Sequence, residues 1–154
     1  MLTDRYGFQL TTPSSVARDA YVAAVDRLLA AGAETEQAFA AAAELDLHFA
    51  LAHAGRARCL ALYARAAEAR AAASRARELA VSATQRERQH VEALALAIEG
   101  DPAASLAATL AHLDECSTKR PAPVGAPVLQ DRYHRIGADM DQVMVIKSPT
   151  DDVR

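Results

Sequence analysis

Residues 84–101 read TQRERQHVEALALAIEGD, and this stretch predicts one helix with both of its ends marked. Thr84 and Glu87 form the T-x-x-E pattern of a capping box, in which a hydroxyl and a carboxylate bind the free backbone N–H groups of the first turn. Gly100 is a typical residue for the end of a helix. Asp101-Pro102 then supplies an acid cap and a proline at the first position of another helix.

The same stretch contains Glu87-x-x-His90, a spacing by which bundle helices present a carboxylate and an imidazole to a metal. A two-metal carboxylate site in a helical bundle needs this pair twice, with further glutamates from two other helices, and the pair occurs once. We therefore expect Glu87 to cap its helix and His90 to lie at the seam between helices, with no metal, cofactor or catalytic residue. A helical metal-binding protein or enzyme built on Glu87-x-x-His90 is the alternative.

Apolar periodicity and end signals extend this pattern along the chain and predict an all-α protein. Thr12-Pro13 is expected to open the first helix, and Thr35 the second. Ala50 and Thr84 begin corresponding helices 34 residues apart, which is the period of a two-helix solenoid unit. Six helices in three hairpins are predicted, at about 14–31, 35–44, 50–63, 66–79, 84–100 and from 102 onward.

Composition limits the core and the partners of this domain. Of the 154 residues 38 are alanine and only 5% are aromatic, so helices must approach closely around small side chains. The formal net charge of -3 leaves no positive excess for a phosphate backbone, and we expect no binding of nucleic acid. Cys59 and Cys116 are far apart and form no CxxC motif, which fits reduced thiols in a cytoplasm.

The first ten residues, MLTDRYGFQL, contain an acid and lack the apolar core of a signal peptide. No run approaches the roughly 18 apolar residues of a membrane span. We therefore expect a soluble cytoplasmic protein that does not bind a membrane.

Two segments together resemble the N-terminal part of the tetratricopeptide-repeat protein 38 family over about residues 1–115. They are AFAAAAELDLHFALAHAGRARCLAL at 38–62 and TQRERQHVEALALAIEGDPAASLAATLAHL at 84–113, and the second is the more specific. The resemblance implies a right-handed stack of about three antiparallel helical hairpins, a TPR-like α-solenoid. It also implies a scaffold role in binding other proteins, and the family has no established catalytic residues to carry over.

The chain departs from the family pattern in three places. Leu47 stands where a proline commonly follows the acid, and Arg56 stands where a leucine is common on the inner face. Residues 116–154 lack helical periodicity, and we expect a proline-containing irregular or disordered tail in which Val143 to Ile146 is the only strand-like run. One hypothesis is therefore a truncated or frame-altered family member without independent function.

The expected function is non-enzymatic protein binding, with a peptide or helix of an unknown partner held against the first helix of each unit. Arg58, Arg88, Gln89 and Glu92 are the polar side chains predicted for this groove. The leucines of the last helix, Leu106, Leu110 and Leu113, are expected to pack against Val91, Leu94 and Ile98. The alternative is that they are exposed at the uncapped terminal hairpin and pair with another chain in a homo-oligomer.

Overall fold

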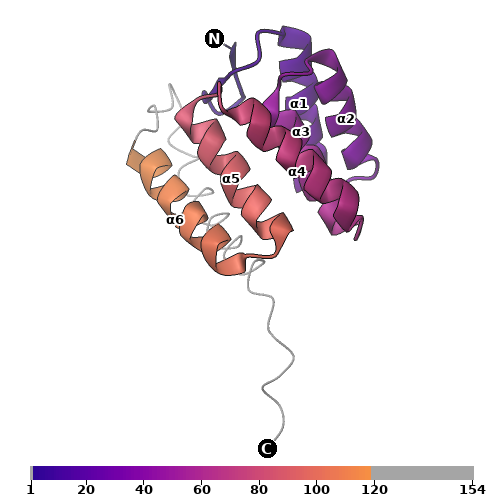
Figure 1. Cartoon of the computed structure of the whole chain (residues 1–154). Coiled ribbons are helices and arrows are strands. Elements are labelled where there is room, and N and C mark those ends of the chain that lie inside the picture. Colours follow the sequence, from indigo (N-terminus) through magenta and orange to yellow (C-terminus); the bar gives the residue numbers. More distant parts are fainter. Residues whose placement is uncertain (1, 119–154) are drawn as a thin grey trace, which may run out of the picture. The chain divides into compact units, whose positions relative to one another are not determined.

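A computed structural model of the chain describes residues 2–118 and contains six helices, as predicted (Figure 1). The helices are α1 (Ser15–Leu29), α2 (Thr35–Leu45), α3 (Ala50–Leu62), α4 (Ala66–Ala80), α5 (Gln85–Glu99) and α6 (Pro102–Thr118). Helix α6 thus includes the first three residues of the expected irregular tail, 116–118. The rest of that tail, with Val143 to Ile146, lies outside the described residues.

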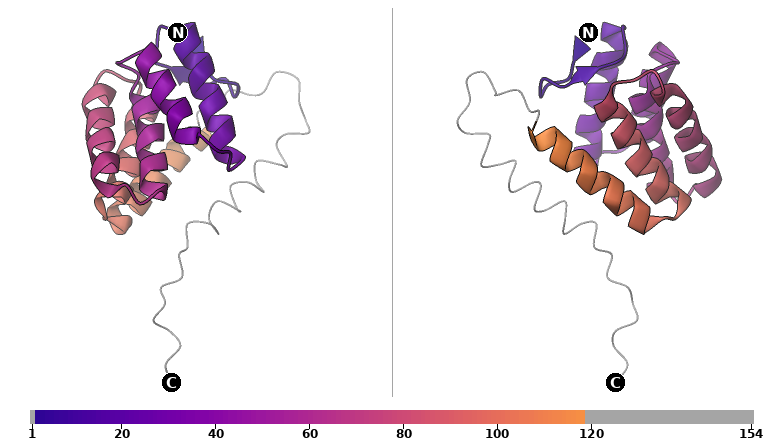
Figure 2. Two further views of the ribbon diagram at one scale, coloured as in Figure 1. Left: turned by 90° about the vertical axis from the view of Figure 1, so that its right-hand side faces the viewer. Right: turned by 60° about the vertical axis from the view of Figure 1, so that its left-hand side comes forward.

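Each helix packs against the next one along the chain, and α3 also packs against α5 (Figures 1 and 2). Within the part of the chain that the structure describes, 15 of the 22 buried apolar residues are alanines. Helices can approach closely where methyl groups are all that separates them, but each alanine removes little apolar area from water. The sequence-based expectation of close helices around a core of small side chains is confirmed.

The largest side chains of the core form an aromatic cluster between the first three helices. The Tyr21 ring on α1 lies edge-on to Phe39 of α2 and to Phe49 at the start of α3, with ring centroids 6.0 and 5.0 Å apart. Burial raises the pKa of the Tyr21 hydroxyl to about 12. Gly55 on α3 makes room for Phe39, because an added Cβ would lie 2.8 Å from Phe39 Cζ and closer still to two other ring carbons.

An N-terminal β-hairpin, which the all-α prediction missed, precedes the helices. Strands β1 (Leu2–Thr3) and β2 (Gln9–Leu10) pair antiparallel with Leu2 opposite Leu10. The turn is stabilised by Asp4, whose Oδ1 accepts from the backbone N–H groups of Tyr6 and Phe8 at 2.9 Å. Leu10 is fully buried and ties the hairpin to the helical core.

Two predicted helix caps are wrong, because the hydroxyls in question bind elsewhere. The N-cap of α1 is Ser14, whose side chain accepts from Ala17 N, while Thr12 Oγ1 donates to Asp46 Oδ2 at 2.6 Å. In α2 the residue at the cap is Glu34, which has a left-handed conformation with φ of 59°. Thr35 is inside the helix, and its hydroxyl donates to the carbonyl of Gly32 at 2.7 Å.

The ends of α5 follow the sequence pattern closely. Thr84 is the N-cap, and Gly100 ends the helix in the left-handed region with φ of 91°. Asp101 caps α6, since its Oδ1 accepts from Ala104 N at 2.9 Å. Because Thr84 is the cap, α5 begins at Gln85. The start of α5 therefore lies 35 residues after the start of α3 at Ala50, whereas a spacing of 34 residues was expected.

Helix α6 packs on α5 through small and polar residues, which corrects the predicted leucine packing. Ser105 is buried, and its hydroxyl donates to the carbonyl of Ala93 on α5 at 2.9 Å. The leucines point away from this contact: Leu106, Leu110 and Leu113 are 60%, 57% and 52% exposed. Their exposure agrees with one part of the alternative stated from the sequence, and pairing with another chain stays a prediction.

Candidate functional site

The Glu87 carboxylate is buried at the start of α5, where it serves as a hub of hydrogen bonds. The capping box is complete: Thr84 Oγ1 accepts from Glu87 N, and Glu87 Oε2 accepts from Thr84 N at 3.0 Å. Glu87 Oε1 also accepts from Thr11 N at 3.0 Å, and Oε2 accepts from the hydroxyls of Thr11 and Thr84. Glu87, which is 1% exposed, therefore joins α5 to the segment after β2, and the predicted capping role is confirmed.

His90 lies one turn further along α5, beside His112 of α6, with ring centroids 5.8 Å apart. Burial between the two helices, followed by the charges at His112, Arg86 and Arg58, lowers the pKa of His90 to about 4. His90 is therefore neutral at pH 7. Within residues 2–118, no group of three or more metal-ligating side chains gathers at this pair or elsewhere.

The other residues singled out by their chemistry have structural environments. His53 is partly buried on α3, with Nε2 3.3 Å from the carbonyl of Leu47, and burial lowers its pKa. Cys59 packs in the core beside Phe39 and Ala24, and burial raises the pKa of its thiol. Arg56, which departs from the family pattern, donates from Nε to Glu36 Oε1 at 2.7 Å and so links α3 to α2.

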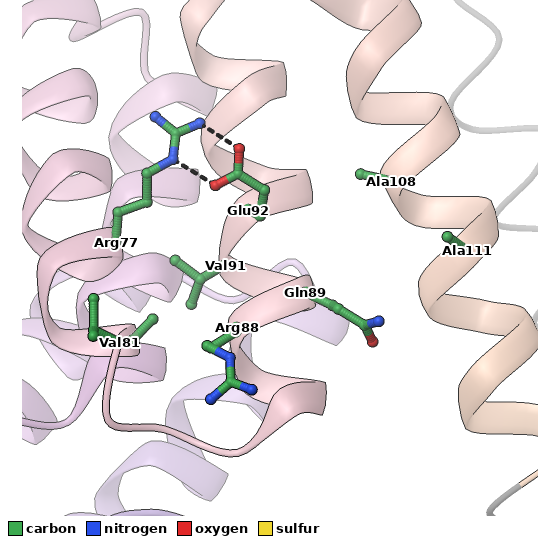
Figure 3. A pocket seen from close by; sticks show the side chains of 9 residues that line it. Arg77, Val81, Arg88, Gln89, Val91, Glu92, Ala108 and Ala111 are labelled. Carbon is green, nitrogen blue, oxygen red and sulfur yellow. Dashed lines mark hydrogen bonds and ion pairs between the residues drawn. The ribbon is translucent and has the colours of Figure 1, made fainter.

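An open groove of about 390 Å³ lies on the surface formed by α4, α5 and α6 (Figure 3). Val91 of α5 is buried at its floor, Ala108 and Ala111 form the wall on α6, and Val81 after α4 is 76% exposed at the opposite side. The volume lies within the range of about 300–1,000 Å³ that is usual for ligand sites. The complete lining is Arg77, Ala80, Val81, Arg88, Gln89, Val91, Glu92, Ala108 and Ala111.

An ion-pair network fixes one part of the groove rim. Arg77 of α4 binds Glu92 of α5 through two hydrogen bonds, from Nε at 2.7 Å and from Nη2 at 3.0 Å (Figure 3). Its guanidinium also binds Glu99, one bond being 3.2 Å from Nη2 to Oε2. The hydrogen bonds to Glu92 and then Glu99 raise the pKa of Arg77. This network holds α4 beside α5 and uses most of the donors of Arg77.

Arg88 and Gln89 contribute polar groups from the first turns of α5. The Nη1 of Arg88 donates to the carbonyl of Ala83 at 2.7 Å, which attaches the guanidinium to the loop between α4 and α5. Gln89 extends toward α6 (Figure 3), where its Oε1 lies 3.3 Å from Nδ1 of His112. Arg88 is exposed, whereas Gln89 is partly buried.

Three of the four residues predicted to line a groove, Arg88, Gln89 and Glu92, line this one. The fourth, Arg58, is partly buried on α3 and is not part of the lining. The sequence analysis predicted a groove formed by the first helix of each unit, whereas the observed groove is also formed by α4 and α6. The sequence analysis missed Arg77 and the apolar floor, because no sequence spacing reveals which residues of three helices meet. Val81 could have been found as an apolar residue just after a predicted helix.

No protein-family model, curated protein or solved structure matches this chain. The family resemblance of residues 38–62 and 84–113 therefore stays a prediction. Among the helices in residues 2–118, none has both the length and the apolar content needed to cross a membrane.

Proposed function

We propose that this chain is a non-enzymatic interaction module that binds a peptide or helix of another protein in the groove between α4, α5 and α6. The observation that carries the proposal is the chemistry of the groove, in which an apolar floor around Val91 is flanked by charged side chains. Apolar floors supply binding energy, and a few polar groups at the rim fix the orientation of the ligand.

The sequence resemblance supports the same class of function. We propose that the pairs α1–α2, α3–α4 and α5–α6 are the hairpins of a TPR-like right-handed stack, located in the cytoplasm. Packing of each helix on its neighbours, and of α3 on α5, is compatible with such repeats. The groove would then lie where the second helices of two successive hairpins flank a first helix.

The metal-binding alternative finds no support in the geometry of Glu87. Its Oε1 accepts from Thr11 N and its Oε2 accepts from Thr84, so a metal at Glu87-x-x-His90 would have to displace these hydrogen bonds. If the alternative were right, added zinc or iron would raise the melting temperature by binding the folded state. We expect no increase.

A display library of random peptides, selected on the immobilised full chain, tests the proposed function. The groove is blocked by Ala111→Trp, and the matched control is Ala103→Trp, also on α6 and exposed but outside the lining. Selected peptides should lose about tenfold or more in affinity for the Ala111 variant and keep their affinity for the Ala103 variant. Failure to select any peptide, or equal binding to both variants, would contradict the proposal.

A further inference from the structure

Arg88 is the one arginine of the groove lining whose charge has no carboxylate partner in residues 2–118. Only its Nη1 is engaged, by the carbonyl of Ala83, which orients the guanidinium without neutralising it. An arginine offers five N–H donors in a planar fork that matches a carboxylate. Exposed donors therefore remain at the groove.

The other charges make the groove electrically asymmetric. Arg77 is bound by both Glu92 and Glu99, so this cluster of one cation and two anions carries a net negative charge. In Figure 3 the Arg77–Glu92 pair and Arg88 lie on different sides of Val91. One side of the apolar floor therefore attracts anions, and the other side does not.

Building on the proposed function, we propose that the groove selects a protein segment with an acidic side chain beside an apolar anchor. The anchor packs over Val91, Ala108 and Ala111, and the Asp or Glu accepts hydrogen bonds from Arg88. A basic residue at the same position of the ligand would meet the uncompensated charge of Arg88 and be rejected. Arg88 thus determines specificity, while the apolar floor contributes affinity for any suitable segment.

Parallel peptide-display selections on wild type, Arg88→Gln and Arg88→Glu test this inference. The matched control is Arg70→Gln, since Arg70 is an exposed arginine on α4 outside the groove. Circular dichroism first establishes that each variant is folded. We expect acidic residues next to apolar ones in peptides selected by wild type and the Arg70 variant. The Arg88→Gln selection should lose this preference, and the Arg88→Glu selection should favour basic residues.

A double-mutant cycle then measures the contact itself. A peptide selected on wild type is synthesised with its acidic residue and with the corresponding amide, and each form is titrated against wild type and Arg88→Gln. Coupling of about fivefold or more in affinity, reduced by added salt, would support a direct ion pair.

The outcomes separate the inference from the proposed function. Peptides that require the groove but show no acidic preference, or no coupling to Arg88, would overturn the inference and leave the proposed function standing. The absence of any peptide that responds to Ala111→Trp would overturn both. An acidic preference that persists with Arg88→Gln would also contradict the role of Arg88.

Discussion

Glu87 shows how one side chain can decide between two interpretations of a motif. Its carboxylate could have faced an imidazole, but it turns back to the helix start and binds backbone and hydroxyl donors from two segments. A buried carboxylate needs several donors because loss of water around a charge is costly. Four donors at Glu87 make it a structural residue.

We expect Glu87→Ala to lower the free energy of unfolding by about 2–4 kcal/mol, because the buried donors of Thr11 and Thr84 lose their acceptor. Chemical denaturation measures this change. The control is Glu78→Ala, since the Arg75–Glu78 pair is exposed and should contribute less than about 1 kcal/mol. Equal effects of the two substitutions would contradict the hub role of Glu87.

His90 should make the stability of the fold depend on pH. Its pKa is about 4 in the folded chain and about 6.5 when unfolded, so only the unfolded chain binds a proton between these values. Stability from this residue is fully present above pH 6.5 and declines as the pH falls toward 4, by on the order of 3 kcal/mol. His112, Arg86 and Arg58 reinforce this direction by opposing a positive charge.

Denaturation of His90→Gln at pH 7 and at pH 4.5 tests this dependence. The variant should lose less stability than wild type over this interval, because the glutamine does not titrate. His48→Gln, at an exposed position, serves as the control and should follow wild type. A His90 variant with the wild-type pH dependence would argue against burial of a neutral imidazole at this site.

At the scale of the helices, α6 shows that residues with apolar periodicity are not always buried. Its leucines occupy one face, as the sequence indicates, yet they are exposed and the buried Ser105 binds α5. Periodicity predicts that residues share a face, but it does not say which neighbouring element that face will meet.

We expect Leu110→Gln to change the free energy of unfolding by less than about 0.5 kcal/mol, since the side chain is already exposed to water. Leu60→Ala is the matched comparison, because Leu60 is 1% exposed in α3 and its truncation should cost about 2–5 kcal/mol. A loss for Leu110→Gln as large as that for Leu60→Ala would indicate that the leucine face is packed.

The sequence predicted the six helices, and its local signals were most accurate at the ends of α5. The capping box at Thr84, the glycine at 100 and the alanine-rich core are each encoded within a few residues. Two of the errors came from distant partners, since Thr12 binds Asp46 and the β-hairpin is held by contacts with the core. The wrong cap at Thr35 was local, because its hydroxyl binds the carbonyl of Gly32. Three residues predicted for a groove, all on α5, line the observed one, whereas Arg77 enters its lining from α4 and no local pattern indicated it.

At the scale of the whole molecule, a core built mainly of alanine in residues 2–118 is accompanied by larger apolar side chains at the surface. Among the described residues, the larger apolar side chains exposed to solvent include Val81 at the groove and the leucines of α6. The groove combines such an apolar surface with fixed charges from two helices, Arg77 of α4 and Arg88 and Glu92 of α5. This combination makes the groove the best candidate for recognition of another protein.

Nuclear magnetic resonance of the isotope-labelled chain, titrated with a display-selected peptide, tests the location of binding most directly. We expect the largest changes in amide chemical shift at the groove, namely at Val81, Arg88, Val91, Ala108 and Ala111. Changes concentrated at Leu106, Leu110 and Leu113, with none at the groove, would contradict peptide binding in the groove.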